Sequence, residues 1–132
     1  MSTPSVLIRD YMRDLLVTLS PDMDVLRAIH LLLENDVPGA PVLDRLGNIV
    51  GFLSEKDAMA VAADASYYED VGGFVKQVMA KKVSTVDADD SIITAAKLFQ
   101  DTEYQALPVM LNGRLAGVLT RRDVLRMFED KR

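Results

Sequence analysis

The sequence of 132 residues contains no cysteine, which excludes a disulfide framework and any thiol chemistry. It has one histidine, so a structural zinc site, which needs several cysteine or histidine ligands, is close to excluded. No apolar run approaches the roughly 20 residues that a membrane-spanning helix requires. We therefore expect a protein that is stabilised by an ordinary hydrophobic core, without covalent or metal cross-links.

Basic charge is also scarce near the N-terminus. No basic run precedes an apolar segment there, so we find no secretory signal and predict a cytoplasmic location. The net charge of −5 makes nucleic acid an improbable partner. Residues 1–73 carry a net charge of −7 and residues 74–132 a net charge of +2. Two differently solvated surfaces would explain this asymmetry, and so would an anion bound near the basic half.

What the sequence does contain is an internal repeat. Residues 17–43 align with residues 84–110, and the match resumes beyond a turn that is one residue shorter in the second copy. We predict a first repeat within residues 1–70, with an N-terminal helix, and a second within residues 71–132, preceded by a short helix. Equivalent pairs include Thr18 and Thr85, Ala28 and Ala95, Pro41 and Pro108, Gly51 and Gly117, Ser54 and Thr120, and Asp57 and Asp123.

The first part of each repeat is typical of a short strand followed by an amphipathic helix. We expect the strands at Val17–Leu19 and Ser84–Val86. The helices follow from apolar residues spaced at i, i+3, i+4 and i+7. In the first helix, Pro21 fits a first-turn position and Ser20 is the candidate cap. The apolar positions are Val25, Ala28, Ile29 and Leu32, and then Ile92, Ala95, Ala96 and Phe99.

The second part of each repeat indicates a β-hairpin and a final helix. Asn112-Gly113 lies between two apolar runs, as in a hairpin turn whose two central residues take positive φ. The final helices should start at Ser54 and Thr120. The predicted hairpin strands are Ala40–Leu43 with Ile49–Leu53, and Leu107–Leu111 with Arg114–Leu119.

Together these elements predict an α/β (α+β) fold built from two β-α-β-β-α repeats. The repeats should pack with pseudo-twofold symmetry, with their sheets facing each other and their helices outside, because neither repeat closes a core alone. Residues Asp64–Gly73 have the composition of a linker. Val71–Met79 should form the short helix that leads into repeat two, and Ser5–Leu15 should play the same part before repeat one.

Each repeat places a hydroxyl and a carboxylate three residues apart where a strand meets a helix. These pairs are Ser54 with Asp57 and Thr120 with Asp123. The spacing matches a capping box, in which the hydroxyl caps the helix and the acid reaches back to the chain. The same geometry suits a ligand, because the helix N-terminus offers N–H groups to a phosphate and the carboxylate can accept the hydroxyls of a ribose. Both interpretations stay open.

The duplicated Gly-x-x-Ser/Thr-x-x-Asp junction, the Thr18–Pro21 segment and the Ala40-Pro41-Val42 strand resemble a tandem cystathionine-β-synthase (CBS) domain pair, or Bateman module. The resemblance covers about residues 5–129. It implies a regulatory module that binds an adenosine-containing ligand, such as AMP, ADP or ATP, in clefts between the repeats. It also implies that the junction acid of one repeat holds the ribose and that the other repeat supplies an apolar slot for the adenine.

The resemblance assigns two sets of ligand-binding residues. For the favoured cleft they are Val118, Thr120, Arg121, Arg122 and Asp123 with Thr18, Ser20, Val25, Val37 and Pro38. For a weaker cleft they are Phe52, Ser54 and Asp57 with Thr85, Ile92, Tyr104 and Gln105.

Charge separates the two clefts. The favoured cleft has Ser20 near the expected phosphate and arginines on the turn beside Asp123. The weaker cleft has Asp87 in place of Ser20 and Glu55 in place of Arg121. A carboxylate beside a phosphate is repulsive at short range, so we expect Asp123 to matter more than Asp57 for nucleotide binding.

We find no set of residues that indicates an enzyme. His30 lies off the apolar stripe of its helix and should be a partly exposed residue, and Asp87–Asp90 should be a solvated helix start without a bound metal. We expect no required cofactor, a homodimer to which the two amphipathic final helices contribute, and an effector protein regulated in trans. Met59, Met127 and Phe128 lie on these helices, and self-association and ordinary core packing would explain them equally well. The alternative is a structural dimerisation module that binds no small ligand.

Overall fold

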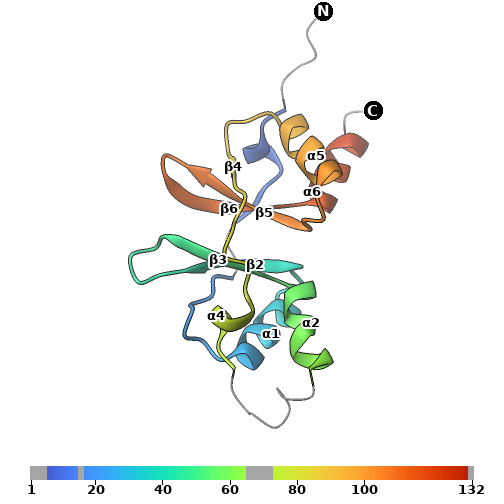
Figure 1. Ribbon diagram of the computed structural model, residues 1–132. Coiled ribbons are helices and arrows are strands. Elements are labelled where there is room, and N and C mark those ends of the chain that lie inside the picture. The colour runs from blue at the N-terminus through green and yellow to red at the C-terminus, as the bar shows by residue number, and fades with distance from the viewer. Residues whose placement is uncertain (1–5, 15–16, 65–72, 131–132) are drawn as a thin grey trace, which may run out of the picture. The chain divides into compact units, whose positions relative to one another are not determined.

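The computed structural model describes residues 6–14, 17–64 and 73–130, and these form two compact units (Figure 1). Of the described residues, unit 1 contains 6–14 and 84–130, and unit 2 contains 17–64 and 73–83. The two units are therefore not the two repeats, and the predicted bounds of the repeats, 1–70 and 71–132, stay a prediction. Each unit combines one repeat with the segment that precedes the other repeat. We call residues 6–14 and 73–83 the leading segments.

Unit 1 is a four-stranded sheet with two helices. The strand order is β1-β6-β5-β4, in which only the β4–β5 pair is parallel. Side chains of α5, α6 and the strands share one core, whose members include Ile92, Phe99, Leu107 and Leu119. The elements are η1 (Ile8–Asp10), β1 (Arg13–Asp14), β4 (Val86–Asp87), α5 (Ile92–Asp101), β5 (Ala106–Leu111), β6 (Arg114–Thr120) and α6 (Arg121–Asp130).

Unit 2 repeats this arrangement with a shorter sheet. Strands β2 and β3 pair antiparallel. Isolated bridges extend the pair on both sides, from Leu19 to Val42 in parallel and from Phe52 to Ala80 antiparallel. The strand order therefore matches that of unit 1. The elements are α1 (Val25–Glu34), β2 (Gly39–Leu43), β3 (Ile49–Ser54), α2 (Glu55–Ala63) and α4 (Val75–Val78).

The predicted α+β class, the two hairpins and the final helices are confirmed. Asn112 and Gly113 have φ values of 53° and 77°, as the hairpin turn requires. Helices α2 and α6 begin directly after Ser54 and Thr120. The pseudo-twofold packing of the repeats, with facing sheets, stays a prediction.

The start of the first helix was predicted wrongly. Helix α1 begins at Val25 and its cap is Asp24, whose carboxylate accepts a hydrogen bond of 2.7 Å from Leu26 N–H. Ser20 and Pro21 instead belong to a turn, in which the Ser20 carbonyl accepts from Met23 N–H at 3.1 Å. Serine and aspartate cap helices about equally well, and Asp24 is the cap because it directly precedes the apolar stripe, whereas Ser20 lies five residues before Val25.

The short edge elements also differ from expectation. Val17–Leu19 makes only the bridge at Leu19, and the Ser84–Val86 strand is shifted to Val86–Asp87. Among the described residues, the helix expected within Ser5–Leu15 is one 3₁₀ turn, and that expected within Val71–Met79 is Val75–Val78. Most of the expected linker, residues 65–72, lies outside the described residues.

The leading segments dock in equivalent ways. Leu7 bridges Ser91, the cap of α5, and Phe74 bridges Asp24, the cap of α1. The next residues, Ile8 and Val75, are completely buried in their units. A repeat in the sequence shows that these segments are alike. It does not show which repeat each one packs against, and for this reason the sequence did not indicate that each unit combines one repeat with the other's leading segment.

Candidate functional site

The junction of unit 2 is a capping box at the start of α2. Ser54 Oγ accepts a hydrogen bond of 3.0 Å from Asp57 N–H, and Ser54 N–H donates to Asp57 Oδ2 over 3.5 Å. Asp57 is half-buried, and it makes no ion pair with any described residue. Its carboxylate therefore keeps most of its capacity to accept hydrogen bonds.

The junction of unit 1 makes the same box with tighter contacts. Thr120 Oγ1 accepts from Asp123 N–H at 3.2 Å, and Thr120 N–H donates to Asp123 Oδ2 at 2.8 Å. Both side chains are buried, and Asp123 is 0% exposed. The capping interpretation thus holds at both junctions, and the acids differ in their access to solvent.

Two arginines hold the buried carboxylate of Asp123. Its Oδ1 atom lies 2.7 Å from Arg126 Nη1 and 3.3 Å from Arg13 Nε. The arginine side chains are 48% and 33% exposed, so solvent screens one side of each pair. Our sequence analysis missed both. The i, i+3 spacing of Asp123 and Arg126 could have indicated one pair, but no local pattern indicates Arg13.

Glycines let the leading segments reach the junctions. Residues Arg13 and Ala80 pair with the residue just after Gly117 and Gly51, respectively. A Cβ atom at Gly117 would collide with the carbonyl oxygen of Arg13, and one at Gly51 would lie 2.9 Å from that of Ala80. The first glycine of each junction motif therefore makes room for the backbone of the leading segment.

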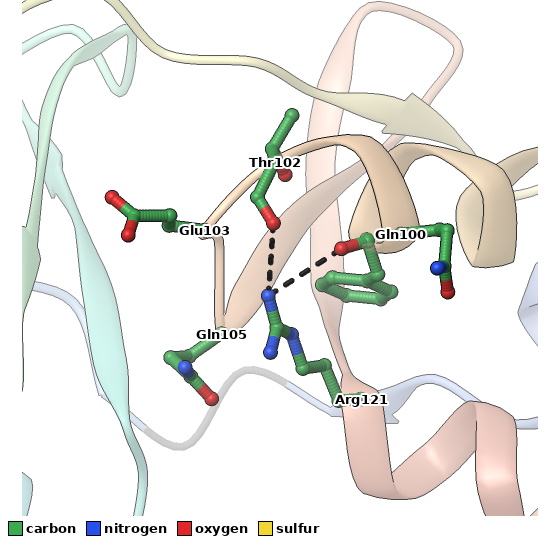
Figure 2. A pocket seen from close by; sticks show the side chains of 6 residues that line it. Gln100, Thr102, Glu103, Gln105 and Arg121 are labelled. Atoms are coloured by element: carbon green, nitrogen blue, oxygen red, sulfur yellow. Dashed lines mark hydrogen bonds between the residues drawn. The ribbon is translucent and has the colours of Figure 1, made fainter.

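The guanidinium of Arg121 is hydrogen-bonded to backbone carbonyls of unit 1 (Figure 2). Its Nη2 donates to the carbonyls of Thr102 at 3.0 Å and Phe99 at 3.4 Å, which are the two bonds drawn in Figure 2. Its Nε donates to the Tyr104 carbonyl at 2.7 Å. These carbonyls lie at the C-terminal end of α5 and just beyond it, where the helix dipole favours a cation. The guanidinium that we expected beside a phosphate thus caps α5, whereas Arg122 is exposed.

Beside this cap lies a pocket of about 460 Å³. It brings together Gln105 and Arg121, which we had placed in different clefts. The backbone N–H of Arg121 also donates to the Gln105 carbonyl at 3.4 Å. In unit 2 the equivalent bond runs from Glu55 N–H to the Pro38 carbonyl at 2.9 Å. The residues lining the pocket are Phe99, Gln100, Thr102, Glu103, Gln105 and Arg121 (Figure 2).

The other predicted ligand residues fall into two groups. Val25 and Ile92 are core residues at the starts of α1 and α5. The rest are exposed or half-buried. The sharing of one ligand by both repeats stays a prediction. The exposed residues are Thr18, Ser20 and Thr85, and the half-buried ones are Val37, Pro38, Phe52, Tyr104 and Val118.

Of the residues that we had set aside, His30 lies as expected, whereas Asp87–Asp90 is not the start of a helix, because Asp87 belongs to β4 and α5 begins at Ile92. The His30 side chain is 71% exposed, and its Nε2 lies 2.7 Å from Glu34 Oε2. Asp87–Asp90 precedes α5, which is capped by Ser91, and Asp89 is paired with Arg9. The described residues contain no group of three or more potential metal ligands. Within the same ranges, no helix has both the length and the apolar character to cross a membrane.

The comparison with protein families matches both repeats. The model described as "CBS domain" matches residues 8–64 and again residues 75–130, which together make up most of the chain. Solved structures agree. CBSX2 from Arabidopsis thaliana, crystallised in complex with AMP, is 30% identical and covers 96% of this chain and 98% of its own, with a TM-score of 0.80.

Other relatives extend the comparison. The CBS domain pair of protein MJ0100, solved with 5-methylthioadenosine and S-adenosyl-L-methionine, covers 98% of this chain with a TM-score of 0.86; at 21% identity it shows the fold alone. Inosine-5'-monophosphate dehydrogenase of Methanocaldococcus jannaschii is 32% identical over 83% of this chain, which spans 21% of the enzyme. This chain spans less than half of the first curated relatives that it matches.

Proposed function

The chain belongs to the CBS domain family, and from this premise we propose that it is a regulatory module that binds an adenosine-containing ligand. We propose AMP as the first ligand to test, because it is bound by a relative that is 30% identical over nearly the whole of both chains. The module would transmit its ligand state to an effector protein in trans. The predictions of a cytoplasmic location and of no catalytic activity of its own stay predictions.

The observation that carries this proposal is the duplicated junction at the starts of α2 and α6. Each junction combines a hydroxyl, a carboxylate and the N-terminal end of a helix of at least nine residues. Backbone N–H groups at such an end attract phosphate, and a carboxylate beside them suits a ribose diol. The half-buried Asp57 retains acceptor capacity for this purpose.

Calorimetric titration tests the proposal directly. AMP, ADP, ATP and S-adenosylmethionine are titrated into the wild type, into a variant with both Asp57→Asn and Asp123→Asn, and into the control Asp36→Asn. Asp36 is an exposed residue with φ of 52°, a conformation that asparagine adopts readily. We expect binding to the wild type and the control, and loss of at least about tenfold in affinity in the double variant. Absence of binding to the wild type would favour a structural dimerisation module.

We also propose that the module is a homodimer that uses its helical faces. The repeats expose apolar side chains at equivalent positions, Leu26 and Ile93 on α1 and α5, and Met59 and Leu125 on α2 and α6. Phe128 adds a further exposed ring on α6. Of the residues that we had predicted here, Met127 is a buried core residue. Sedimentation that shows only monomer at high concentration would exclude this assembly.

A further inference from the structure

The two junctions differ at the positions that surround the acid. Arg13 of unit 1 pairs with Val118, and its equivalent Ala80 in unit 2 pairs with Phe52. One turn into the final helix, Arg126 is likewise replaced by Ala60. Asp123 therefore has two cationic neighbours, and the residues equivalent to them in unit 2 are alanines.

The hydrogen-bonding capacity of the two acids differs for this reason. A carboxylate accepts about four hydrogen bonds. Asp123 receives close contacts from Thr120 N–H, Arg126 and Arg13, and none of its surface is exposed. The carboxylate of Asp57 receives one hydrogen bond, from Ser54 N–H at 3.5 Å, and Asp57 is only half-buried. A ribose diol needs two acceptor positions on one accessible carboxylate, and Asp57 is the acid that offers them.

We infer that Arg13 and Arg126 are specificity-determining residues that withdraw Asp123 from ligand binding, so that binding of the ribose depends on Asp57. This inference rests on the proposed function. It reverses the order of the two acids that we expected from the sequence. That order relied on Arg121 for a phosphate, and Arg121 is bonded to the carbonyls at the end of α5.

The junction of unit 1 then has a different role, as an anchor for its leading segment. Arg13 belongs to β1, and its ion pair with Asp123 joins this strand to α6 across 110 positions of sequence. Tyr11 strengthens the same connection, since its hydroxyl donates to Asp130 Oδ2 at 2.9 Å. Unit 2 makes no such ion pair between Ala80 and α2, because alanine has no charge.

Reciprocal exchange of the neighbours tests the inference with AMP as the probe. In the wild type we expect one binding site per chain by calorimetry. Asp57→Asn should lower the affinity at least tenfold, and Asp123→Asn should change it less than threefold. The double variant Arg13→Ala, Arg126→Ala should raise the stoichiometry toward two. The matched double variant Ala80→Arg, Ala60→Arg, at two exposed positions, should abolish binding.

A second measurement leaves Asp123 in place and so covers the case in which Asp123→Asn fails to fold. The Arg13→Ala and Arg126→Ala changes form a double-mutant cycle in urea denaturation, because both side chains contact Asp123 Oδ1, and the matched cycle in unit 2 uses Ala80→Ser and Ala60→Ser. We expect strong coupling in the first cycle and none in the second. Additive effects in the first cycle would contradict the anchor.

The outcomes separate the inference from the proposed function. Loss of AMP binding in Asp123→Asn with retention in Asp57→Asn would overturn the inference and leave the proposed function intact. Unchanged stoichiometry in the Arg13→Ala, Arg126→Ala variant would also count against it. If no adenosine compound binds to the wild type, the proposed function fails, and the assignment of Asp57 fails with it.

Discussion

The two junctions share a motif and a backbone but differ in their electrostatic surroundings. In unit 1 two guanidinium groups hold the buried acid, and in unit 2 the acid is half-buried and the residues equivalent to these arginines are alanines. The residues that cause this difference lie outside the motif. One is a turn further along the helix, and the other precedes the motif by more than one hundred positions. A local motif therefore places the acid, and its more distant neighbours decide what the acid can bind.

Removal of the two acids should produce the largest difference in stability between the two junctions. Asp123→Ala leaves two arginines and the Thr120 N–H without their partner, so we expect the free energy of unfolding to fall by about 3 kcal/mol. Asp57→Ala removes one weak cap contact and should cost about 1 kcal/mol. Urea denaturation followed by circular dichroism measures both. Equal losses would mean that the ion pairs contribute nothing.

The glycines should show where the two units are alike. Gly51→Ala and Gly117→Ala each place a Cβ atom against the backbone of a leading segment. We expect each change to cost about 2 kcal/mol, because the segment must move away. Thermal unfolding of the two variants provides the measurement. If only one of them is destabilised, the leading segments are not docked equivalently.

Substitution of the first residues of the two final helices, Arg121 and Glu55, should produce a smaller difference in stability. Arg121→Ala removes three hydrogen bonds to carbonyls near the end of α5, and we expect a loss of about 1 kcal/mol, since the arginine is partly exposed. Glu55→Ala alters an exposed side chain and should stay within about 0.5 kcal/mol. Chemical denaturation of both variants distinguishes these values. A larger loss for Glu55→Ala would show that its contacts matter more than those of Arg121.

The smallest expected difference in stability between the units lies in the hairpin turns, and it depends on pH. A hydrogen bond from Asn48 N–H, with help from Leu46 N–H, lowers the pKa of Asp44 below its ordinary value of 3.8. The folded state therefore gains stability above the unfolded pKa and loses it as the pH falls through the folded pKa.

Asp44→Asn removes this acid from the turn of unit 2, whereas the Asn112-Gly113 turn of unit 1 has no acid to lose. The melting temperature of Asp44→Asn should be slightly below that of the wild type at pH 7, and the gap should close in strong acid. A gap that is the same at pH 7 and pH 3 would contradict the role of the charged carboxylate.

Much of each repeat was predictable because its determinants are local. Each of these determinants lies within a few neighbouring residues of the sequence. Examples are the apolar stripe that ends in Leu32, the Asn112-Gly113 turn and the capping spacing of Ser54 and Asp57. The hairpin strands and the final helices were predicted within a residue or two, whereas the start of α1 was predicted four residues too early. The cap of α1 was missed because Ser20 and Asp24 both have the right chemistry, and position alone decides between them.

The arrangement around Asp123 could not be predicted in this way. Arg13 reaches the acid only because its leading segment docks on the second repeat, and two similar segments offered two possible dockings. The hydrogen bonds of Arg121 depend on where α5 ends, which the periodicity of its apolar residues does not specify. The contacts of the site that could not be predicted therefore depend on pairing between residues that are far apart in the sequence.

The exchange of leading segments also imposes an order on folding during synthesis. The described residues of unit 2, 17–64 and 73–83, lie between the two parts of unit 1 in the sequence, so they leave the ribosome before residues 84–130 have been made. Residues 6–14 are made before unit 2, yet they can dock only when β6 is available, and the chain between them and β6 includes all the described residues of unit 2. These residues thus reach their native place after unit 2 is complete, and until then the apolar side chain of Ile8 lacks the partners that bury it.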